Sequence, residues 1–204
     1  MSNKSGNQAA EQGQDRRSQR TQQALIDALL ILLTVKHYDA ISIKDIVDRA
    51  NVGRSTFYAH FQTKDDLLRS GFDRVLDMFL QHIVISIEDR DLKLDTTPLF
   101  RHARGHYELY RTLAWGPGIE ILTKDGHAAL SAKLQRYLVQ FVPERQESSI
   151  PLPILSYSMA GSLLLLLKWW LDRKMPYSPE RMNEIFQQLV MPGIRGTLGL
   201  IGNQ

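Results

Sequence analysis

The sequence of 204 residues contains no cysteine. Structural disulfides, thiolate nucleophiles and cysteine-based zinc sites are therefore excluded, and a reducing compartment is the natural interpretation. Glycine, proline and charged residues are not in excess, and 43% of the residues are hydrophobic. The composition is therefore that of a globular chain that is long enough to bury a core, in one domain or two small ones.

Long apolar segments are also scarce. The first 20 residues lack an apolar stretch, so we expect no signal peptide. The longest apolar run is the five leucines at 163–167, which Lys168 interrupts. A helix that spans a membrane needs about 18 to 20 mostly apolar residues. We therefore expect a buried helix there, and a soluble, cytoplasmic protein with no membrane partner.

Signatures of catalysis are missing as well. The sequence has no thiol, no glycine-rich loop for phosphates, no Gly-x-Ser-x-Gly elbow and no carboxylate pair with a clear catalytic spacing. We therefore predict that the protein is not an enzyme and carries no cofactor.

No segment shows the sustained alternation of a strand bounded by hairpin signals, so the predicted fold is all-α. Residues 1–17 are polar and are expected to form a flexible arm. Residues 18–64 are expected to form one domain and residues 65–204 a second, larger one, with a loop at 87–97. The expected helices are 18–36, 43–50, 54–61, 64–83, 98–113, 117–123, 126–142, 151–174 and 179–195.

Local residues define the ends of the short helices near the N-terminus. Ser42 is the expected N-cap of helix 43–50, with Asp45 completing an acidic capping box. Asn51 tolerates the left-handed conformation that ends a helix, and Gly53 can cap the next helix. Thr63 is the expected cap of helix 64–83. In helix 18–36 the expected buried stripe is Leu25, Ala28, Leu29, Leu32 and Val35.

Positive charge is concentrated in the same region. Residues 16–64 hold eight Lys or Arg against four Asp or Glu, whereas residues 65–204 hold sixteen of each. The whole chain has a net charge of only +3. A local basic excess of this kind indicates an anionic partner such as nucleic acid.

Two short helices joined by a three-residue turn, behind a longer helix, form a helix-turn-helix. The second helix of this motif fits the major groove of DNA, and its first residues reach base edges. Val52, Phe57 and Phe61 should face inward. The remaining face offers groups for bases and phosphates, namely Arg54, Ser55, Thr56, Tyr58 and His60, with Lys64 at the start of the next helix.

Residues 42–68, SIKDIVDRANVGRSTFYAHFQTKDDLL, resemble the N-terminal signature of the TetR family of transcriptional regulators. The resemblance implies a three-helix DNA-binding domain joined through a fourth helix to a helical domain that binds a ligand and forms a dimer. It also implies a palindromic operator that a small molecule releases. By resemblance the DNA-facing positions are Ser42, Gly53, Arg54, Ser55, Thr56, Tyr58, His60 and Lys64. The family usually has Gly at Asn51 and Ser at Gly53, which puts the detailed contacts in question.

The C-terminal helices are unusually apolar. A helix that is apolar around most of its circumference must be covered on several sides, by its own core or by a second subunit. Burial within one chain is the alternative to a dimer. The residues expected in a dimer interface are Leu155, Met159, Leu163, Leu166, Trp170, Ile185 and Leu189. Residues 161–189 also loosely resemble the C-terminal domain of regulators of the dihydroxyacetone-kinase-operon type.

A ligand pocket is harder to predict. His102 and His106 share a helix face, which could suit a metal, but no nearby Glu or Cys completes a ligand set, so no metal is predicted. The residues predicted to line a small-molecule pocket are His102, His106, Tyr107, Tyr110, Trp115, Tyr157 and Trp169. For each aromatic residue, packing in the core is the alternative.

The leading hypothesis is a dimeric DNA-binding regulator, most simply a repressor, with an operator, a small-molecule effector and a second copy of itself as partners. One alternative is an adaptor or coactivator of the same fold that acts through a protein partner, which the basic face argues against. A helical carrier or enzyme has only the apolar C-terminal region in its favour.

Overall fold

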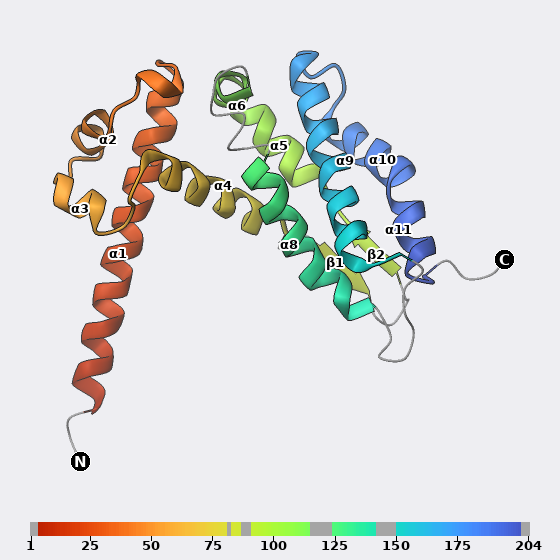
Figure 1. Cartoon of the computed structure of the whole chain (residues 1–204), viewed down its shortest axis with the longest axis horizontal. Coiled ribbons are helices and arrows are strands. Elements are labelled where there is room, and N and C mark those ends of the chain that lie inside the picture. The colour runs from red at the N-terminus through yellow and green to blue at the C-terminus, as the bar shows by residue number, and fades with distance from the viewer. Residues whose placement is uncertain (1–3, 81–82, 87–90, 115–123, 142–149, 201–204) are drawn as a thin grey trace. The chain divides into compact units, whose positions relative to one another are not determined.

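The computed structural model describes residues 4–80, 83–86, 91–114, 124–141 and 150–200 (Figure 1). The chain divides into an N-terminal unit, Met1–Gly71, and a C-terminal unit, Phe72–Gln204. The division falls within helix α4 (Lys64–Leu80), beyond the boundary predicted between residues 64 and 65. The first turns of α4 belong to the N-terminal unit because Leu67 and Leu68 are buried and Gly71 packs against Ile26.

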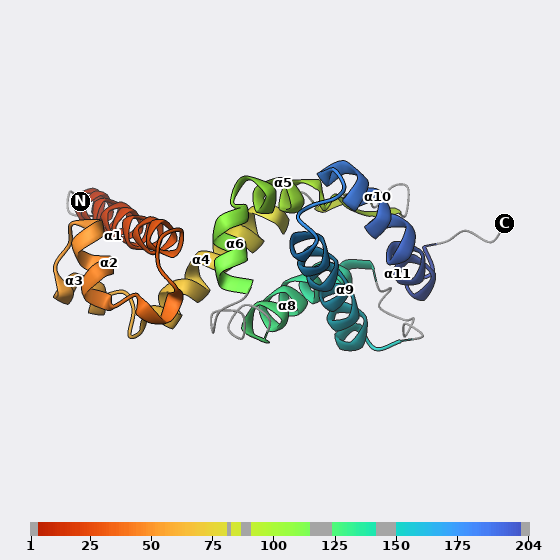
Figure 2. The same ribbon diagram turned by 90° about the horizontal axis from the view of Figure 1, so that it is seen from above.

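The N-terminal unit is a small helical bundle. It contains α1 (Lys4–Leu33), the 3-10 turn η1 (Tyr38–Ala40), α2 (Ile43–Ala50), α3 (Arg54–Tyr58) and the start of α4. Helix α2 packs against α1, and α3 packs against α2 (Figures 1 and 2). Their shared core consists of Leu25, Leu29, Ile46, Phe57 and Leu67, which are fully or almost fully buried.

Helix α1 differs from the prediction at both ends. It begins at Lys4, so most of the expected flexible arm, residues 1–17, is helical. Residues 8–17, QAAEQGQDRR, include Ala, Gln and Arg, which are good helix formers. The helix ends at Leu33, and the chain turns through hydrogen bonds to the carbonyls of Ile31 and Leu32. Val35 is therefore 73% exposed and does not belong to the buried stripe.

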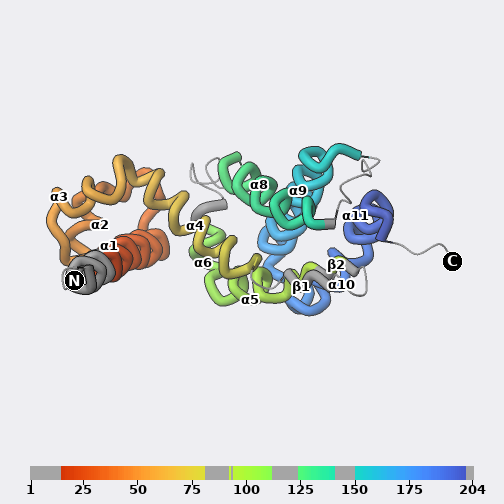
Figure 3. Tube along the Cα trace, turned by 90° about the horizontal axis from the view of Figure 1, so that it is seen from below, coloured from red at the N-terminus to blue at the C-terminus, as the bar shows by residue number. Residues whose placement is uncertain are grey.

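The C-terminal unit contains most of the remaining helices. They are α5 (Thr97–Gly105), α6 (Tyr107–Ala114), α8 (Gly126–Leu138) with the 3-10 turn η3 (Val139–Phe141), α9 (Leu152–Asp172), α10 (Pro179–Leu189) and α11 (Met191–Thr197). Helix α8 packs along α9, and α10 packs against α5 (Figures 2 and 3). Phe79, Phe100 and Trp170 are among the large side chains of this core.

A short antiparallel ladder interrupts the helices. Strand β1 (Ile83–Ser86) pairs with β2 (Asp91–Leu94), and Ile83 lies opposite Leu94. The prediction that helix 64–83 includes Ile83 is therefore wrong, and so is the prediction that all of 87–97 is a loop. Strands of four residues are too short to show sustained alternation, although buried Leu92 and Leu94 flank Lys93. The fold class remains all-α, as predicted.

Two predicted helices are broken in the structure. The helix expected at 98–113 is interrupted at His106, whose φ of −121° and ψ of 33° are not helical. The helix expected at 179–195 is interrupted at Val190, between α10 and α11. The helix expected at 117–123 lies outside the described residues. Helices α8 and α9 agree with the predicted spans to within a few residues.

Helix α9 has apolar residues both on the side that faces the core and on the side that faces away from it. Leu155, Met159, Leu163 and Trp170 are at most 5% exposed and pack in the core of their own chain, so the prediction that they form a dimer interface is wrong. Leu166 and Ile185 are partly buried, and Leu189 is 70% exposed. The outer face of α9 carries the exposed apolar residues Ile154, Tyr157, Leu165 and Trp169, which we call the outer α9 face.

Among the described helices, α9 alone is long and apolar enough to cross a membrane. Core helices of soluble proteins pass the same test of length and composition, and α9 packs with α8 and α6. Its apolar inner face is therefore accounted for by the core of the C-terminal unit.

Candidate nucleic-acid interface

Ser42 fixes the start of α2. Its hydroxyl accepts a hydrogen bond from the Asp45 backbone N–H at 3.2 Å and donates to the Asp45 carboxylate at 2.7 Å. The Ser42 backbone N–H donates to the same carboxylate at 2.9 Å, which completes the predicted capping box. These bonds from the Ser42 hydroxyl and N–H, followed by one from Lys36, hold the pKa of Asp45 well below its usual range. Because the Ser42 hydroxyl is engaged at α2, its predicted contact with DNA stays a prediction.

Replacing Ser42 with Ala should destabilise the N-terminal unit. An N-cap serine contributes about 1 kcal/mol to helix stability, so the S42A variant should lose roughly that much free energy of unfolding. Since the folded pKa of Asp45 is depressed, the contribution of its carboxylate is present at neutral pH and fades as the pH falls. Urea unfolding at pH 7 and pH 3 measures both effects. If S42A lost the same free energy of unfolding at both pH values, the hydrogen bonds between Ser42 and the Asp45 carboxylate would not stabilise the helix as described.

The turn between α2 and α3 has the predicted geometry. Asn51 adopts the left-handed conformation, with φ 52° and ψ 48°, and the N–H of Val52 bonds the carbonyl of Val47 at 3.0 Å. Gly53 is the N-cap of α3 and has no side chain to complete the cap. A Cβ at Gly53 would lie 3.6 Å from the Ser55 hydroxyl, an ordinary contact, so the serine usual in the family would fit.

Helix α3 has an apolar inner side and a polar outer side. Phe57 and Phe61 are buried, as predicted, and Val52 is partly buried. The helix ends at Tyr58 and not at Phe61. Four residues of the predicted set are exposed and two are partly buried. The exposed ones are Gly53, Arg54, Ser55 and Tyr58, and the partly buried ones are Thr56 and His60.

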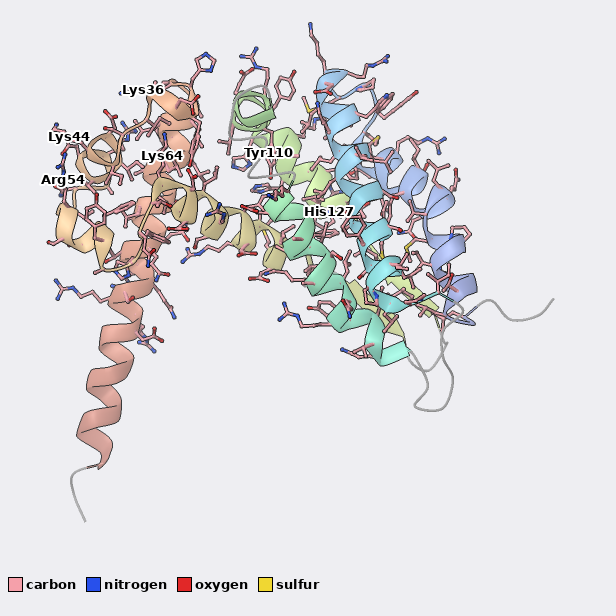
Figure 4. The ribbon with its side chains drawn as sticks, in the orientation of Figure 1. Lys36, Lys44, Arg54, Lys64, Tyr110 and His127 are labelled. Carbon is pink, nitrogen blue, oxygen red and sulfur yellow. The ribbon has the colours of Figure 1, made fainter. Side chains whose placement is uncertain are left out.

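Arg54 lies at the first position of α3 and has no hydrogen bond or ion pair within the part of the chain that the structure describes. A hydrogen bond to the Asp48 carboxylate at 2.8 Å raises the pKa of Lys44 in α2, and the nearby Arg54 charge opposes this more weakly. Both cations lie at the same outer edge of α2 and α3 (Figure 4). Lys44 was missed by the sequence analysis. Its position on the exposed side of α2, opposite the buried Ile46 and Val47, could have identified Lys44 as a candidate DNA contact.

Lys64 has a different environment from the other cations. Its ammonium donates to the carbonyl of Tyr38 at 2.8 Å and to the carbonyl of Ile41 at 3.0 Å. Thr63 caps α4 as predicted, through hydrogen bonds in both directions with Asp66. The start of α4 therefore holds Lys64 against the connector between α1 and α2. Its predicted contact with phosphate has no support from this geometry.

The predicted ligand-binding residues fall into separate groups. His102 and His106 stack with ring centroids 4.3 Å apart, and Tyr110 meets His102 edge to face at 6.0 Å. Burial, followed by the charge of His106, lowers the pKa of His102, and burial raises the pKa of Tyr110. Tyr107 packs against the same core. These residues lie together in α5 and α6, as the spacing predicts.

The other predicted ligand-binding residues lie elsewhere. Tyr157 is exposed, and its ring contacts His127 with centroids 4.0 Å apart. Trp169 is 41% exposed and stacks on Tyr177. Trp115 lies outside the described residues. The structure therefore does not unite the predicted set into one pocket. Among the described residues, no group of three or more potential metal ligands comes together.

A cleft of about 250 Å³ lies between α4 and α8. Its lining is Asp77, Leu80, Lys133, Arg136, Tyr137 and Gln140, so none of the predicted ligand-binding residues takes part. Lys133 is ion-paired with Asp77 and lies 3.5 Å from Asp73. Arg136 makes no ion pair among the described residues. The cleft is therefore polar and offers one uncompensated guanidinium.

Helices α2 and α3, with a polar outer face and a buried aromatic inner face, form a helix-turn-helix motif. Residues 25–70 match the family model described as "Bacterial regulatory proteins, tetR family". The N-terminal segment is therefore similar to the DNA-binding domain of this family of regulators.

Two curated proteins are similar over part of the chain. The HTH-type transcriptional regulator YxbF of Bacillus subtilis is 34% identical over 90 residues, which are 44% of this chain and 24% of YxbF. The Transposon Tn10 TetC protein of Escherichia coli is 36% identical over 63 residues, which are 31% of this chain and 32% of TetC. The chain thus spans about a quarter to a third of the length of these relatives.

Solved structures resemble a larger part of the chain. The dihydroxyacetone kinase operon activator DhaS matches with a TM-score of 0.57 and 18% identity, over 87% of this chain and 97% of DhaS. At this identity the match shows a common fold. The match confirms the predicted all-α fold over both units.

Proposed function

We propose that this protein is a dimeric, cytoplasmic repressor that binds a palindromic DNA operator and leaves it when a small molecule binds the C-terminal unit. The observation that carries the proposal is Arg54, an exposed guanidinium without a partner among the described residues, at the first turn of α3. An arginine in this place can bond the O6 and N7 atoms of guanine in bidentate fashion.

The proposed DNA contacts centre on α3. Arg54 reads a base, while Ser55, Thr56 and Tyr58 offer hydroxyls to bases or phosphates. Lys44 joins this set because its exposed ammonium on α2 is within electrostatic range of Arg54. Gly53 supplies only backbone groups, and His60 offers a ring N–H to phosphate from the partly buried end of the motif.

The proposed dimer forms through the outer α9 face. Ile154, Tyr157, Leu165 and Trp169 are between 41% and 69% exposed, on a helix whose other side is already buried. An apolar stripe of this kind, left uncovered by the described residues of its own chain, favours a protein partner. A twofold dimer would cover the same stripe on both copies and would present two α3 helices to a palindrome.

The proposed effector binds in the C-terminal unit. The α4–α8 cleft is one candidate site, because Arg136 and Tyr137 offer donors to a small anionic molecule. The stacked His102 and His106 beside Tyr110 form a second candidate site. In either case the effector must bind the DNA-free form more tightly, since only differential affinity shifts the equilibrium.

Replacing Arg54 with Ala should weaken binding to the operator by roughly 10- to 100-fold, which corresponds to the loss of one bidentate base contact. It should also relax the sequence preference at one base pair in each half-site. The operator is first obtained by selection from random DNA with the wild-type protein. Affinities of wild type and R54A are then measured by fluorescence anisotropy on that operator and on single-base variants.

Arg104 provides a matched control for R54A. It is an exposed arginine of α5 and, like Arg54, has no ion pair or hydrogen bond among the described residues. R104A should leave both affinity and sequence preference unchanged. If R54A behaves like R104A, the proposed reading face is wrong. If the wild-type protein selects no sequence, specific DNA binding itself is refuted.

A further inference from the structure

Lys64 joins α4 to a segment that is distant in sequence. The connector after α1 contains η1 (Tyr38–Ala40) and leads to Ile41, just before α2. Two carbonyls of this connector accept hydrogen bonds from the Lys64 ammonium, at 2.8 Å for Tyr38 and 3.0 Å for Ile41. An ammonium has three N–H donors, so two of the three are already directed at protein atoms.

Tyr38 holds the same junction from the other side. Its side chain is 3% exposed, and its hydroxyl donates a hydrogen bond to the carboxylate of Asp65, the residue after Lys64. The Lys64 ammonium also lies over the Tyr38 ring, 4.3 Å from the centroid. Burial and the bond to Asp65 raise the pKa of Tyr38, so the hydroxyl stays protonated and remains a donor. Consecutive residues of α4 thus engage one tyrosine through three kinds of contact.

We propose that Tyr38, Lys64 and Asp65 form a clamp that fixes the first turn of α4 on the helix-turn-helix, and that Lys64 is a positioning residue and not a phosphate contact. The inference rests on the proposed function. Helix α4 runs without interruption past Gly71, where the chain enters the C-terminal unit. The clamp therefore sets the direction in which α4 leaves the recognition helices.

A fixed direction matters when two copies read one palindrome. The spacing of the two half-sites must match the spacing of the two α3 helices in the dimer. A loose junction would leave each helix-turn-helix able to bind a half-site but would weaken their simultaneous binding. Removal of a cation that binds phosphate would instead weaken every DNA complex and would reduce its salt dependence.

The experiment compares K64M and Y38F with the wild type on two DNA probes. Methionine keeps most of the apolar stem of Lys64 and removes the donors, while phenylalanine removes only the buried hydroxyl of Tyr38. Affinity is measured on the full palindrome and on an isolated half-site, over a series of salt concentrations. We expect both variants to bind the full palindrome about tenfold more weakly, since each loses at least one charge-assisted hydrogen bond of the clamp. Half-site affinity and the salt slope should stay near the wild-type values.

Lys44→Met is the matched control, because it removes an exposed ammonium at the edge that Lys44 shares with Arg54. K44M should weaken binding to both probes and lower the salt slope by about one, since one cation no longer neutralises a phosphate.

If K64M behaves like K44M while Y38F behaves like wild type, Lys64 binds phosphate and the clamp is refuted. If both variants lose half-site binding and helical content together, the residues serve folding alone, which also refutes the clamp. A wild-type protein that selects no operator would instead refute the proposed function.

Discussion

Replacing Leu165 with Asp is expected to convert the proposed dimer into single chains of 23.4 kDa. Leu165 is 69% exposed on the outer α9 face, so the substitution leaves the core of its own chain intact. In the proposed dimer the same position is covered by the second copy. A carboxylate buried there without a partner would cost far more than the apolar contact contributes.

The loss of the dimer should also appear in DNA binding. Two linked half-site contacts increase affinity by roughly 100-fold or more over one, so L165D should bind the full palindrome at least that much more weakly. Its affinity for an isolated half-site should match that of the wild type. Sedimentation equilibrium and anisotropy on the two probes measure these effects. Unlike the clamp variants, L165D should change the molecular mass.

Val35→Asp is the control for L165D. Val35 is 73% exposed and lies in the N-terminal unit, so V35D adds the same charge at an equally exposed apolar position. V35D should keep the mass of the wild type. If L165D also keeps that mass, the outer α9 face is not the interface. If the wild type is itself a single chain, the dimer is refuted.

Local signals allowed the helix-turn-helix to be predicted closely. The capping box of Ser42 and Asp45, the left-handed Asn51 and the cap at Thr63 all involve residues within a few positions of one another. Each depends on backbone donors and conformations that the neighbouring residue types determine. The assignment of Phe57 and Phe61 to the inner side succeeded for the same reason.

The role of Lys64 could not be predicted in this way. Its carbonyl acceptors belong to residues 26 and 23 positions earlier, in a connector without a regular pattern. A lysine at the start of a helix in a basic segment therefore predicted a contact with an external phosphate. Only the tertiary fold brings Tyr38 beneath it. The break at His106 and the short β1–β2 ladder are further features that packing determines and periodicity does not.

Helix α9 shows a second limit of sequence patterns. Leu163 and Leu165 are chemically identical and two positions apart, yet one is fully buried and the other is 69% exposed. Periodicity identifies an apolar stripe, but on a helix that is apolar all around it cannot tell which side faces the core. The predicted dimer residues were therefore taken from the inner side. The surrounding helices α6 and α8 determine the choice.

Replacing Trp170 with Ala is expected to destabilise the C-terminal unit by roughly 3 to 5 kcal/mol, the usual cost of truncating a buried aromatic residue. The Trp170 side chain is fully buried and meets Phe100 edge to face, with centroids 5.2 Å apart. Its indole N–H also donates to the carbonyl of Tyr177 at 2.9 Å. The W170A variant would leave that carbonyl without its partner, which adds to the cost of the cavity. A loss of this size is a large part of the roughly 5 to 15 kcal/mol that stabilises a typical protein.

Trp169→Ala is the matched control, because it truncates the same residue type one position earlier in α9. Trp169 is 41% exposed and contacts Tyr177 and Arg173, so its loss should cost clearly less stability. Urea unfolding followed by circular dichroism, at one fixed protein concentration, measures both variants, since the stability of a dimer depends on concentration. W170A should unfold at a much lower urea concentration than the wild type, and W169A near the wild-type midpoint. W169A should also form a weaker dimer than W170A, because Trp169 belongs to the outer α9 face. Truncation of a side chain lowers stability strongly only where that side chain fills the interior. If W170A were stable but monomeric and W169A were strongly destabilised, Trp170 would lie in the interface and Trp169 in the core, and the prediction would be wrong.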